Sequence, residues 1–203
     1  MAAPIPGDPA LGLPELFSLY PFPLKDPAAF LELSFGAVLV MRELLEKTPQ
    51  ARLVCLVPDE RREKWARGKL ESLSSRARFV RADPAEGGWS GALPEGFHFI
   101  AVSWGIEEVA PGKRMDLVRR LAEKLRPGGM LAVLAAVETP KLLTDQYRLL
   151  LKEDAPLPPL PAEGSQPDTE GRLKFLLEAA NLRPADLFWK KGPYALVFGM
   201  KAV

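Results

Sequence analysis

Residues 97–137 constrain the fold of this chain more than any other segment. An apolar run at 97–103 is followed by helical periodicity over 114–124, a turn at 125–129 and a second apolar run at 130–137. A strand whose side chains are apolar on both faces must lie inside a sheet that helices cover. The segment therefore predicts one βαβ unit of a parallel α/β sheet.

The rest of the chain alternates in the same way. Apolar runs predict strands at 29–33, 52–57, 78–82, 97–103, 130–137, 187–189 and 194–201. Helical periodicity predicts helices over 37–47, 59–72, 114–124, 142–152 and 170–180. We therefore expect an α/β fold of the Rossmann-like type, with a seven-stranded, mostly parallel sheet and helices on both faces.

Length and composition predict a single structural domain after a short leading segment. The chain has 203 residues, of which 47% are hydrophobic, which is enough for one full core. Residues 1–25 are rich in proline and nearly uncharged, so we expect them to stand apart from a domain over 26–203. Residues 139–171 interrupt the alternation with a proline-rich stretch, and the sequence leaves open a lid over a site or a passive connector.

Charge and cysteine usage exclude several functional classes. The 27 Lys and Arg nearly balance the 26 Asp and Glu, so net charge does not indicate nucleic-acid binding. The apolar runs are too short to cross a bilayer, and the start lacks the pattern of a signal peptide. The single Cys55 lies in an apolar run, as expected of a core residue in a reducing compartment, and we expect a cytoplasmic protein. The 21 prolines and single asparagine are typical of thermophilic proteins.

Residues 97–137 resemble the second half of class I S-adenosylmethionine-dependent methyltransferases. That family shows Phe-Asp, an apolar run, a helix, the turn Leu-Lys/Arg-Pro-Gly-Gly and an apolar strand, and this chain has Arg126, Pro127, Gly128 and Gly129 in the turn. The ending of helix, strand, short turn and strand is also similar. The resemblance implies S-adenosylmethionine as cofactor and an antiparallel last strand. It also implies that strand 130–137 lies between strands 97–103 and 194–201.

The family's first strand ends in Glu/Asp-x-Gly-x-Gly-x-Gly, a loop that lets the backbone approach the amino-acid end of the cofactor. The matching residues here are Glu32, Ser34, Gly36 and Val38, so only the middle glycine is retained. The resemblance makes Glu32, Ser34 and Gly36 candidates for cofactor binding. A β-branched residue does not easily adopt positive φ, so Val38 adds bulk where the family has a glycine.

Two further landmarks of the family follow the second and third strands. Val57 stands where the family has a carboxylate for the ribose hydroxyls, and a valine side chain accepts no hydrogen bond. Asp59 and Glu60 are the nearby substitutes for cofactor binding, although Asp59 also fits the N-cap of the next helix, which we prefer. Asp83 matches the family's adenine-binding aspartate, and Asp before Pro is also common turn chemistry.

The fourth predicted strand carries the remaining candidates. His98, the only histidine, replaces the family's aspartate at the start of this strand, away from the edge where ligands bind, so we expect it at the border of the core. At the other end, Ser103 is a candidate for cofactor binding, and Trp104 and Glu107 are candidates for substrate binding. Glu107 and Glu108 also fit solvated loop carboxylates, and Trp104 fits a cover over the sheet end.

Other chemistries find little support. One Cys and one His do not make a structural zinc site, and the sequence has neither a nucleophile elbow nor a phosphate-binding loop. The leading hypothesis is a methyltransferase-like protein with a degenerate cofactor site, in which S-adenosylmethionine binding is weak or absent. The alternative is a catalytically silent binding or scaffold protein of the same fold. A nicotinamide-dependent enzyme is a third hypothesis. The acceptor is not identified, whether the protein is an enzyme stays open, and a homodimer is one arrangement to test.

Overall fold

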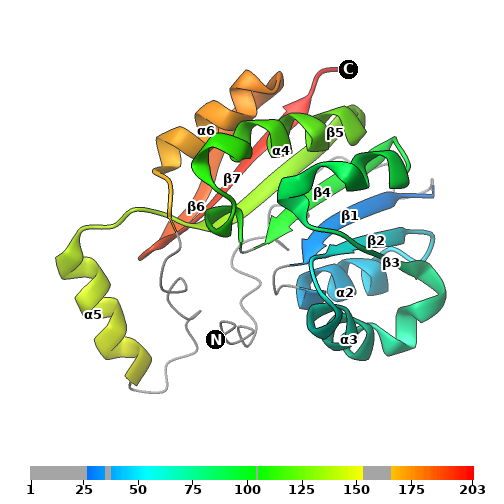
Figure 1. Cartoon of the computed structure of the whole chain (residues 1–203), viewed down its shortest axis with the longest axis horizontal. Coiled ribbons are helices and arrows are strands. Elements are labelled where there is room, and N and C mark those ends of the chain that lie inside the picture. Colours follow the sequence, from blue (N-terminus) through cyan, green and yellow to red (C-terminus); the bar gives the residue numbers. More distant parts are fainter. Residues whose placement is uncertain (1–26, 35–37, 104, 153–165) are drawn as a thin grey trace.

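The computed structural model describes residues 27–34, 38–103, 105–152 and 166–203 (Figure 1). The sheet strands are β1 (Ala29–Ser34), β2 (Arg52–Val57), β3 (Ala77–Arg81), β4 (Phe97–Ser103), β5 (Leu125–Ala136), β6 (Leu182–Lys191) and β7 (Tyr194–Lys201). The α-helices are α2 (Val38–Lys47), α3 (Glu60–Lys69), α4 (Pro111–Lys124), α5 (Lys141–Lys152) and α6 (Glu170–Ala179). Short 3-10 helices are η1 (Glu71–Arg76), η2 (Pro84–Glu86), η3 (Gly88–Ala92) and η4 (Ile106–Glu108). Among these described helices, none is both long and apolar enough to cross a membrane. The proline-rich segment 1–25 lies outside the described residues.

The strands form one seven-stranded sheet in the order β3-β2-β1-β4-β5-β7-β6. Neighbouring strands from β3 to β5 are parallel, whereas β7 runs antiparallel to both β5 and β6. The predicted sheet is confirmed, including β5 between β4 and β7 and the reversed last strand. After β3 the chain crosses back to begin β4 on the other side of β1, so the direction of progression reverses at the β1–β4 pair.

The helices form two layers. Since parallel crossovers are right-handed, a progression from β1 to β3 and an opposite one from β4 to β5 place their helices on opposite faces. The helices α2 and α3 contact each other, and so do α4 and α6. Figure 1 shows α4 and α6 side by side over one face of the sheet, while α5 stands away from it. The central strands are covered from both sides, and every residue of β4 is buried.

Three local predictions differ from the structure. The predicted turn 125–129 is the irregular start of β5, since Phe97 pairs with Leu125 whereas Phe99 pairs with Met130. Glycine is needed there because a Cβ at Gly129 would lie 2.8 Å from the Phe97 carbonyl oxygen. The strand predicted at 187–189 extends over the whole of β6, an edge strand whose register shifts accommodate a proline. The helix predicted over 59–72 ends at Lys69 and gives way to η1.

Candidate functional site

The reversal between β1 and β4 defines the candidate site. In open α/β sheets, ligands bind outside the carboxyl ends of the strands at the point where strand progression reverses. The last pair of the two strands is Ser34 with Ser103, so the site begins beyond these residues. Two predicted site residues, Gly36 and Trp104, lie outside the described residues, and for Ser34 only the backbone is described.

Glu32 lies in the middle of the sheet near this edge. It pairs in register with Cys55 of β2 and with Ala101 of β4. Its side chain is fully buried, and among the described residues neither carboxylate oxygen has a hydrogen-bond partner. Desolvation by burial raises the pKa of this carboxyl from 4.5 to about 8. A buried polar group without a partner destabilises a fold, so packing alone does not explain a glutamate at this position.

Cys55, the neighbour of Glu32, behaves as the core residue that the sequence predicts. It is a free, buried cysteine. Burial raises the pKa of its thiol well above the usual range, and the charge of Glu32 raises it further. Because the thiolate is the reactive form, Cys55 is not a candidate nucleophile.

Ser103 supplies a second buried polar atom at the same edge. Its Oγ is buried and has no hydrogen-bond partner in the described part of the chain. On the adjacent strands β1 and β4, Glu32 pairs with Ala101 and, two residues further along, Ser34 pairs with Ser103. Side chains two residues apart in a strand point to the same face. The Glu32 and Ser103 side chains therefore share one face of the sheet, and the two predicted residues are brought together.

The carboxylates after β2 and β3 serve as caps. Val57 is fully buried and offers no acceptor. Asp59 is the N-cap of α3, and its Oδ1 accepts a hydrogen bond from the Arg62 backbone N–H at 2.8 Å. Asp83 is the N-cap of η2, and its Oδ1 accepts from the Ala85 N–H at 2.8 Å. The preferred cap interpretation of Asp59 is thus confirmed, and contacts of either carboxylate with a cofactor remain predictions.

Glu107 is buried in the loop after β4. Its Oε2 accepts a hydrogen bond from the Gly105 backbone N–H at 3.1 Å. Burial raises the pKa of this carboxyl, and backbone hydrogen bonds, among them those of Gly105 and Ala136, act in the opposite direction. Glu107 is therefore not a solvated loop carboxylate. Its observed partners are backbone groups that hold η4 in place, and a contact with substrate remains a prediction.

An ion pair spans the site between its two flanking loops. Arg62, in the first turn of α3, places one guanidinium nitrogen 3.4 Å from Oε2 of Glu108 in η4. Another guanidinium nitrogen lies 3.7 Å from Oδ2 of Asp59. Since α3 follows β2 and η4 follows β4, with β1 between these strands, the Arg62–Glu108 pair crosses the carboxyl end of β1.

Arg114 is a buried arginine that the sequence analysis did not identify. Its Nε donates to the Val109 carbonyl at 2.8 Å, and one terminal nitrogen forms an ion pair with Asp168 at 2.7 Å. The other terminal nitrogen donates to the carbonyls of Glu107 and Gln166. One side chain thereby joins the loop after β4, the start of α4 and the end of the 139–171 segment.

Two backbone hydrogen bonds hold the start and the end of that segment. The Gln166 N–H donates to the Glu107 carbonyl at 3.1 Å, and the Glu138 N–H donates to the Asp168 carbonyl at 3.0 Å. A sequence signal for Arg114 existed, because it lies on the buried stripe of α4. The other members of that stripe are Leu117, Val118, Leu121 and Ala122. A charged residue at such a position predicts a buried network.

His98 lies at the border of the core, as predicted. Its Nδ1 is 3.2 Å from the Ala29 backbone N–H, and its Nε2 is 2.7 Å from a guanidinium nitrogen of Arg126. These contacts join the amino ends of β1 and β4 with the start of β5. His98 is therefore at the opposite edge of the sheet from the candidate site.

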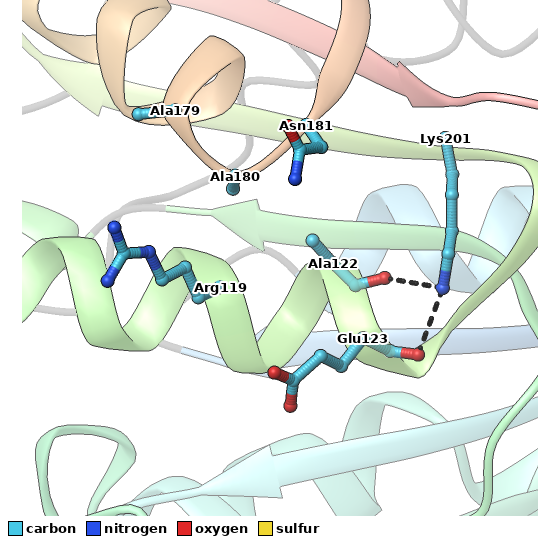
Figure 2. A pocket seen from close by; sticks show the side chains of 7 residues that line it. All are labelled: Arg119, Ala122, Glu123, Ala179, Ala180, Asn181 and Lys201. Atoms are coloured by element: carbon cyan, nitrogen blue, oxygen red, sulfur yellow. Dashed lines mark hydrogen bonds between the residues drawn. The ribbon is translucent and has the colours of Figure 1, made fainter.

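A separate cavity of about 300 Å³ lies between α4, α6 and β7 (Figure 2). It is lined by Arg119, Ala122, Glu123, Ala179, Ala180, Asn181 and Lys201. The Lys201 ammonium donates to the carbonyls of Ala122 and Glu123 at 3.1 and 3.2 Å, which caps the end of α4. This end of β7 pairs with the start of β5, so the cavity lies away from the candidate site. Within the described residues, no group of three His, Cys, Asp or Glu side chains could hold a metal ion.

Comparisons with known proteins agree with this architecture. No family model and no curated protein matches the chain. The S-adenosylmethionine-dependent methyltransferase SibL in its apo form matches 94% of this chain and 55% of its own, with 18% identity and a TM-score of 0.67. PigF with SAH matches 94% of this chain and 55% of its own, with 18% identity and a TM-score of 0.64. The mitomycin 7-O-methyltransferase MmcR matches 89% of this chain and 51% of its own, with 21% identity and a TM-score of 0.64.

The fold is that of class I S-adenosylmethionine-dependent methyltransferases. The chain spans about half the length of these solved structures. At this level of identity the similarity concerns the fold, and the argument for function depends on the residues of the site.

Proposed function

We propose that a crevice at the carboxyl ends of β1 and β4, beside Glu32, binds S-adenosylmethionine and that the chain is a methyltransferase-like protein that uses this cofactor. The observation that carries this proposal is the fully buried Glu32 carboxylate, which has no hydrogen-bond partner among the described residues. S-adenosylmethionine brings an ammonium and a sulfonium, and a buried carboxylate is stabilised by a cationic partner. The similar fold of SibL and of PigF with SAH supports the choice of this cofactor.

The residues fit one end of the cofactor better than the other. On one face of the sheet, Glu32 and Ser103 offer polar atoms that have no partner among the described residues, which suits the amino-acid end. Val57 offers none for the ribose hydroxyls, and each hydroxyl left unpaired on burial costs about 1–3 kcal/mol. We therefore expect binding that is at least about tenfold weaker than with a carboxylate at this position.

The cofactor supplies an electrophilic methyl group on its sulfonium, for transfer to a nucleophilic atom of the acceptor. The contribution of this chain is mainly positioning. Glu32 would hold the ammonium of the cofactor. Arg114 ties the loop after β4 to the later end of the 139–171 segment, and the Glu138 N–H, which donates to the Asp168 carbonyl, holds its start. We propose a small-molecule acceptor, in line with the similar fold of MmcR, a mitomycin 7-O-methyltransferase.

The same proposal includes the domain boundaries of the protein, its cellular location and its oligomeric state. We propose a methyltransferase-like domain over 26–203, with residues 139–171 as a lid or a connector beside the site, because the Gln166 N–H donates to the Glu107 carbonyl in η4. We further propose a cytoplasmic, thermophilic protein that forms a homodimer. Sedimentation of the purified chain tests the dimer.

Isothermal titration calorimetry with S-adenosylmethionine and S-adenosylhomocysteine tests the proposal. Wild type should bind both weakly, NADH should not bind, and Glu32→Gln should abolish the signal. Glu123→Gln is the matched control because Glu123 is exposed at the opposite edge of the sheet. Equal affinity in wild type and Glu32→Gln, or no binding by wild type, would contradict the proposal, and the second result would favour the silent scaffold.

A further inference from the structure

Charge is unevenly distributed over the fold, although the whole chain is nearly neutral. Eight of the 27 Lys and Arg, but only three of the 26 Asp and Glu, lie between residues 60 and 81. This segment therefore has five net positive charges, and the rest of the chain has four net negative charges. It comprises α3, η1 and β3 and so forms one edge of the sheet with the helix that covers it.

One face of α3 combines cations with an aromatic ring. Arg61, Lys64, Trp65 and Gly68 are spaced as i, i+3, i+4 and i+7, which places them along one stripe of the helix. We call these four residues the α3 stripe. Arg61, Lys64 and Trp65, together with Glu60, line a hollow on the surface.

The members of the α3 stripe are available for contact. Arg61 and Lys64 are exposed, and within the described part of the chain neither forms a hydrogen bond or an ion pair. Trp65 is half-buried. A Cβ built on Gly68 would meet no atom within 4 Å, so the helix backbone is open there to close approach. Glycine inside an exposed helix costs about 1 kcal/mol relative to alanine, so packing and helix propensity do not explain Gly68.

Further cations extend this surface toward β3. The Arg67 guanidinium lies 4.3 Å from the centre of the Phe79 ring. Arg67 and Arg81 both pair with the Glu63 carboxylate, Arg81 also lies 3.9 Å from a carboxylate oxygen of Glu60, and both arginines remain more than half exposed. Their hydrogen bonds lower the pKa of Glu63. Two carboxylates match these two arginines, so the five net positive charges of residues 60–81 come from the other side chains of the segment, Arg61 and Lys64 of the α3 stripe among them.

We propose that the α3 stripe and the adjacent edge of β3 bind single-stranded nucleic acid. Its phosphates match the exposed cations, and an aromatic ring between cations offers a surface on which an unpaired base stacks. An acidic peptide would match the charges but would not use the ring in this way. Since α3 begins at the crevice, where Arg62 meets Glu108, a strand along the stripe leads to the edge of the candidate site. The inference goes beyond the proposed methyl transfer and does not require a bound cofactor.

Fluorescence anisotropy with a labelled mixed-sequence RNA of about 20 nucleotides tests the proposal, in salt from about 50 to about 300 mM. Wild type should bind, and its affinity should fall linearly with salt on logarithmic axes. Arg61→Glu with Lys64→Glu should weaken binding at least about tenfold and reduce the magnitude of the salt slope by about 1.4, the value for two phosphate contacts on a single strand. Trp65→Leu should weaken binding about fivefold or more without changing the slope.

The control is the equal charge reversal Lys113→Glu with Arg119→Glu on α4, which covers the other face of the sheet. It should change affinity less than about twofold, since distant charges are screened at these salt concentrations. Melting curves establish whether each variant is folded. If Trp65→Leu does not fold, the double variant Arg61→Glu with Lys64→Glu, whose substituted residues are exposed, still tests the proposal. Any of three results would overturn the proposal. Wild type does not bind RNA, or the control variant loses as much affinity as the double variant. In the third, polyglutamate displaces RNA and Trp65→Leu does not change RNA affinity.

Discussion

The buried carboxylate of Glu32 gives the sharpest test of how this fold relates stability to function. The perturbation is Glu32→Gln, which keeps the shape of the side chain and removes its ability to ionise. In the folded protein the pKa of Glu32 is about 8, compared with 4.5 for the exposed carboxyl of the unfolded chain. The folded state therefore holds the proton more tightly.

The sign and size of the effect follow from this difference. Below pH 4.5 the carboxyl is protonated in both states and Glu32 does not affect the pH dependence. Between pH 4.5 and about 8 only the unfolded state releases the proton, so the free energy of unfolding falls by about 1.4 kcal/mol per pH unit. The loss amounts to about 3 kcal/mol at pH 7 and about 5 kcal/mol above pH 8.

Glu32→Gln should therefore match wild type near pH 4.5 and become more stable than wild type by these amounts as the pH rises. Urea unfolding followed by circular dichroism from about pH 5 to about pH 9 measures the difference. The burial of Glu107 raises its pKa too, but its contribution is present in both proteins and cancels. Glu123→Gln, an exposed control, should show no pH-dependent difference from wild type. A variant that is less stable than wild type at every pH, or a difference that does not change with pH, would refute the reasoning.

The same substitution should affect ligand binding in the opposite direction. If Glu32 holds the ammonium of S-adenosylmethionine, binding at pH 7 requires the carboxyl to lose its proton. Affinity should then rise up to about tenfold per pH unit until about pH 8, and calorimetry in buffers of different ionisation enthalpy should detect the released proton. A substitution that stabilises the fold and weakens binding is the expected signature of a residue kept for function.

Three further predictions concern the surroundings of this residue. Val57→Asp with Val38→Gly should strengthen S-adenosylmethionine binding and destabilise the free protein, because it restores an acceptor and removes a β-branched side chain. Ligand at 100 times its dissociation constant should add about 2.7 kcal/mol to the free energy of unfolding, measured as a rise in melting temperature. A folded variant whose melting temperature does not change with ligand would contradict it. Arg114→Met should lower the free energy of unfolding, measured by urea denaturation, by about 3–5 kcal/mol, because it leaves the Asp168 carboxylate without its buried partner. A loss below about 1 kcal/mol would mean that the hydrogen bonds and the ion pair of Arg114 add little to stability. Arg62→Ala should raise ligand affinity, because it removes the ion pair with Glu108 that crosses the entrance to the site. An exposed ion pair is worth at most about 1 kcal/mol, so the gain should be up to about fivefold in low salt and smaller in high salt. Unchanged titrations would show that the pair does not obstruct the crevice.

The sequence predicted the sheet more fully than the site. The strand order was predictable because apolar runs such as the one in β4 require burial on both faces, and because the turn before Met130 resembles a known family. The boundaries of β6 were not predictable, because a proline normally indicates that a strand does not extend past it. In β6 the strand lies at the edge of the sheet, and register shifts accommodate the proline. In the site, the capping role of Asp59 depended on one backbone contact, which the structure shows, whereas its contact with a cofactor remains a prediction.

Local sequence determined which residues of this protein are buried and which form strands and helices, because side-chain periodicity follows directly from backbone geometry. Only the tertiary structure decided which polar groups meet. Arg62 finds Glu108 46 positions along the chain, and Arg114 finds Asp168 54 positions along. That Glu32 has no hydrogen-bond partner among the described residues likewise becomes visible only in the tertiary structure, where β1 lies in register between β2 and β4. Such contacts depend on packing across long connections, and no spacing along the chain encodes them.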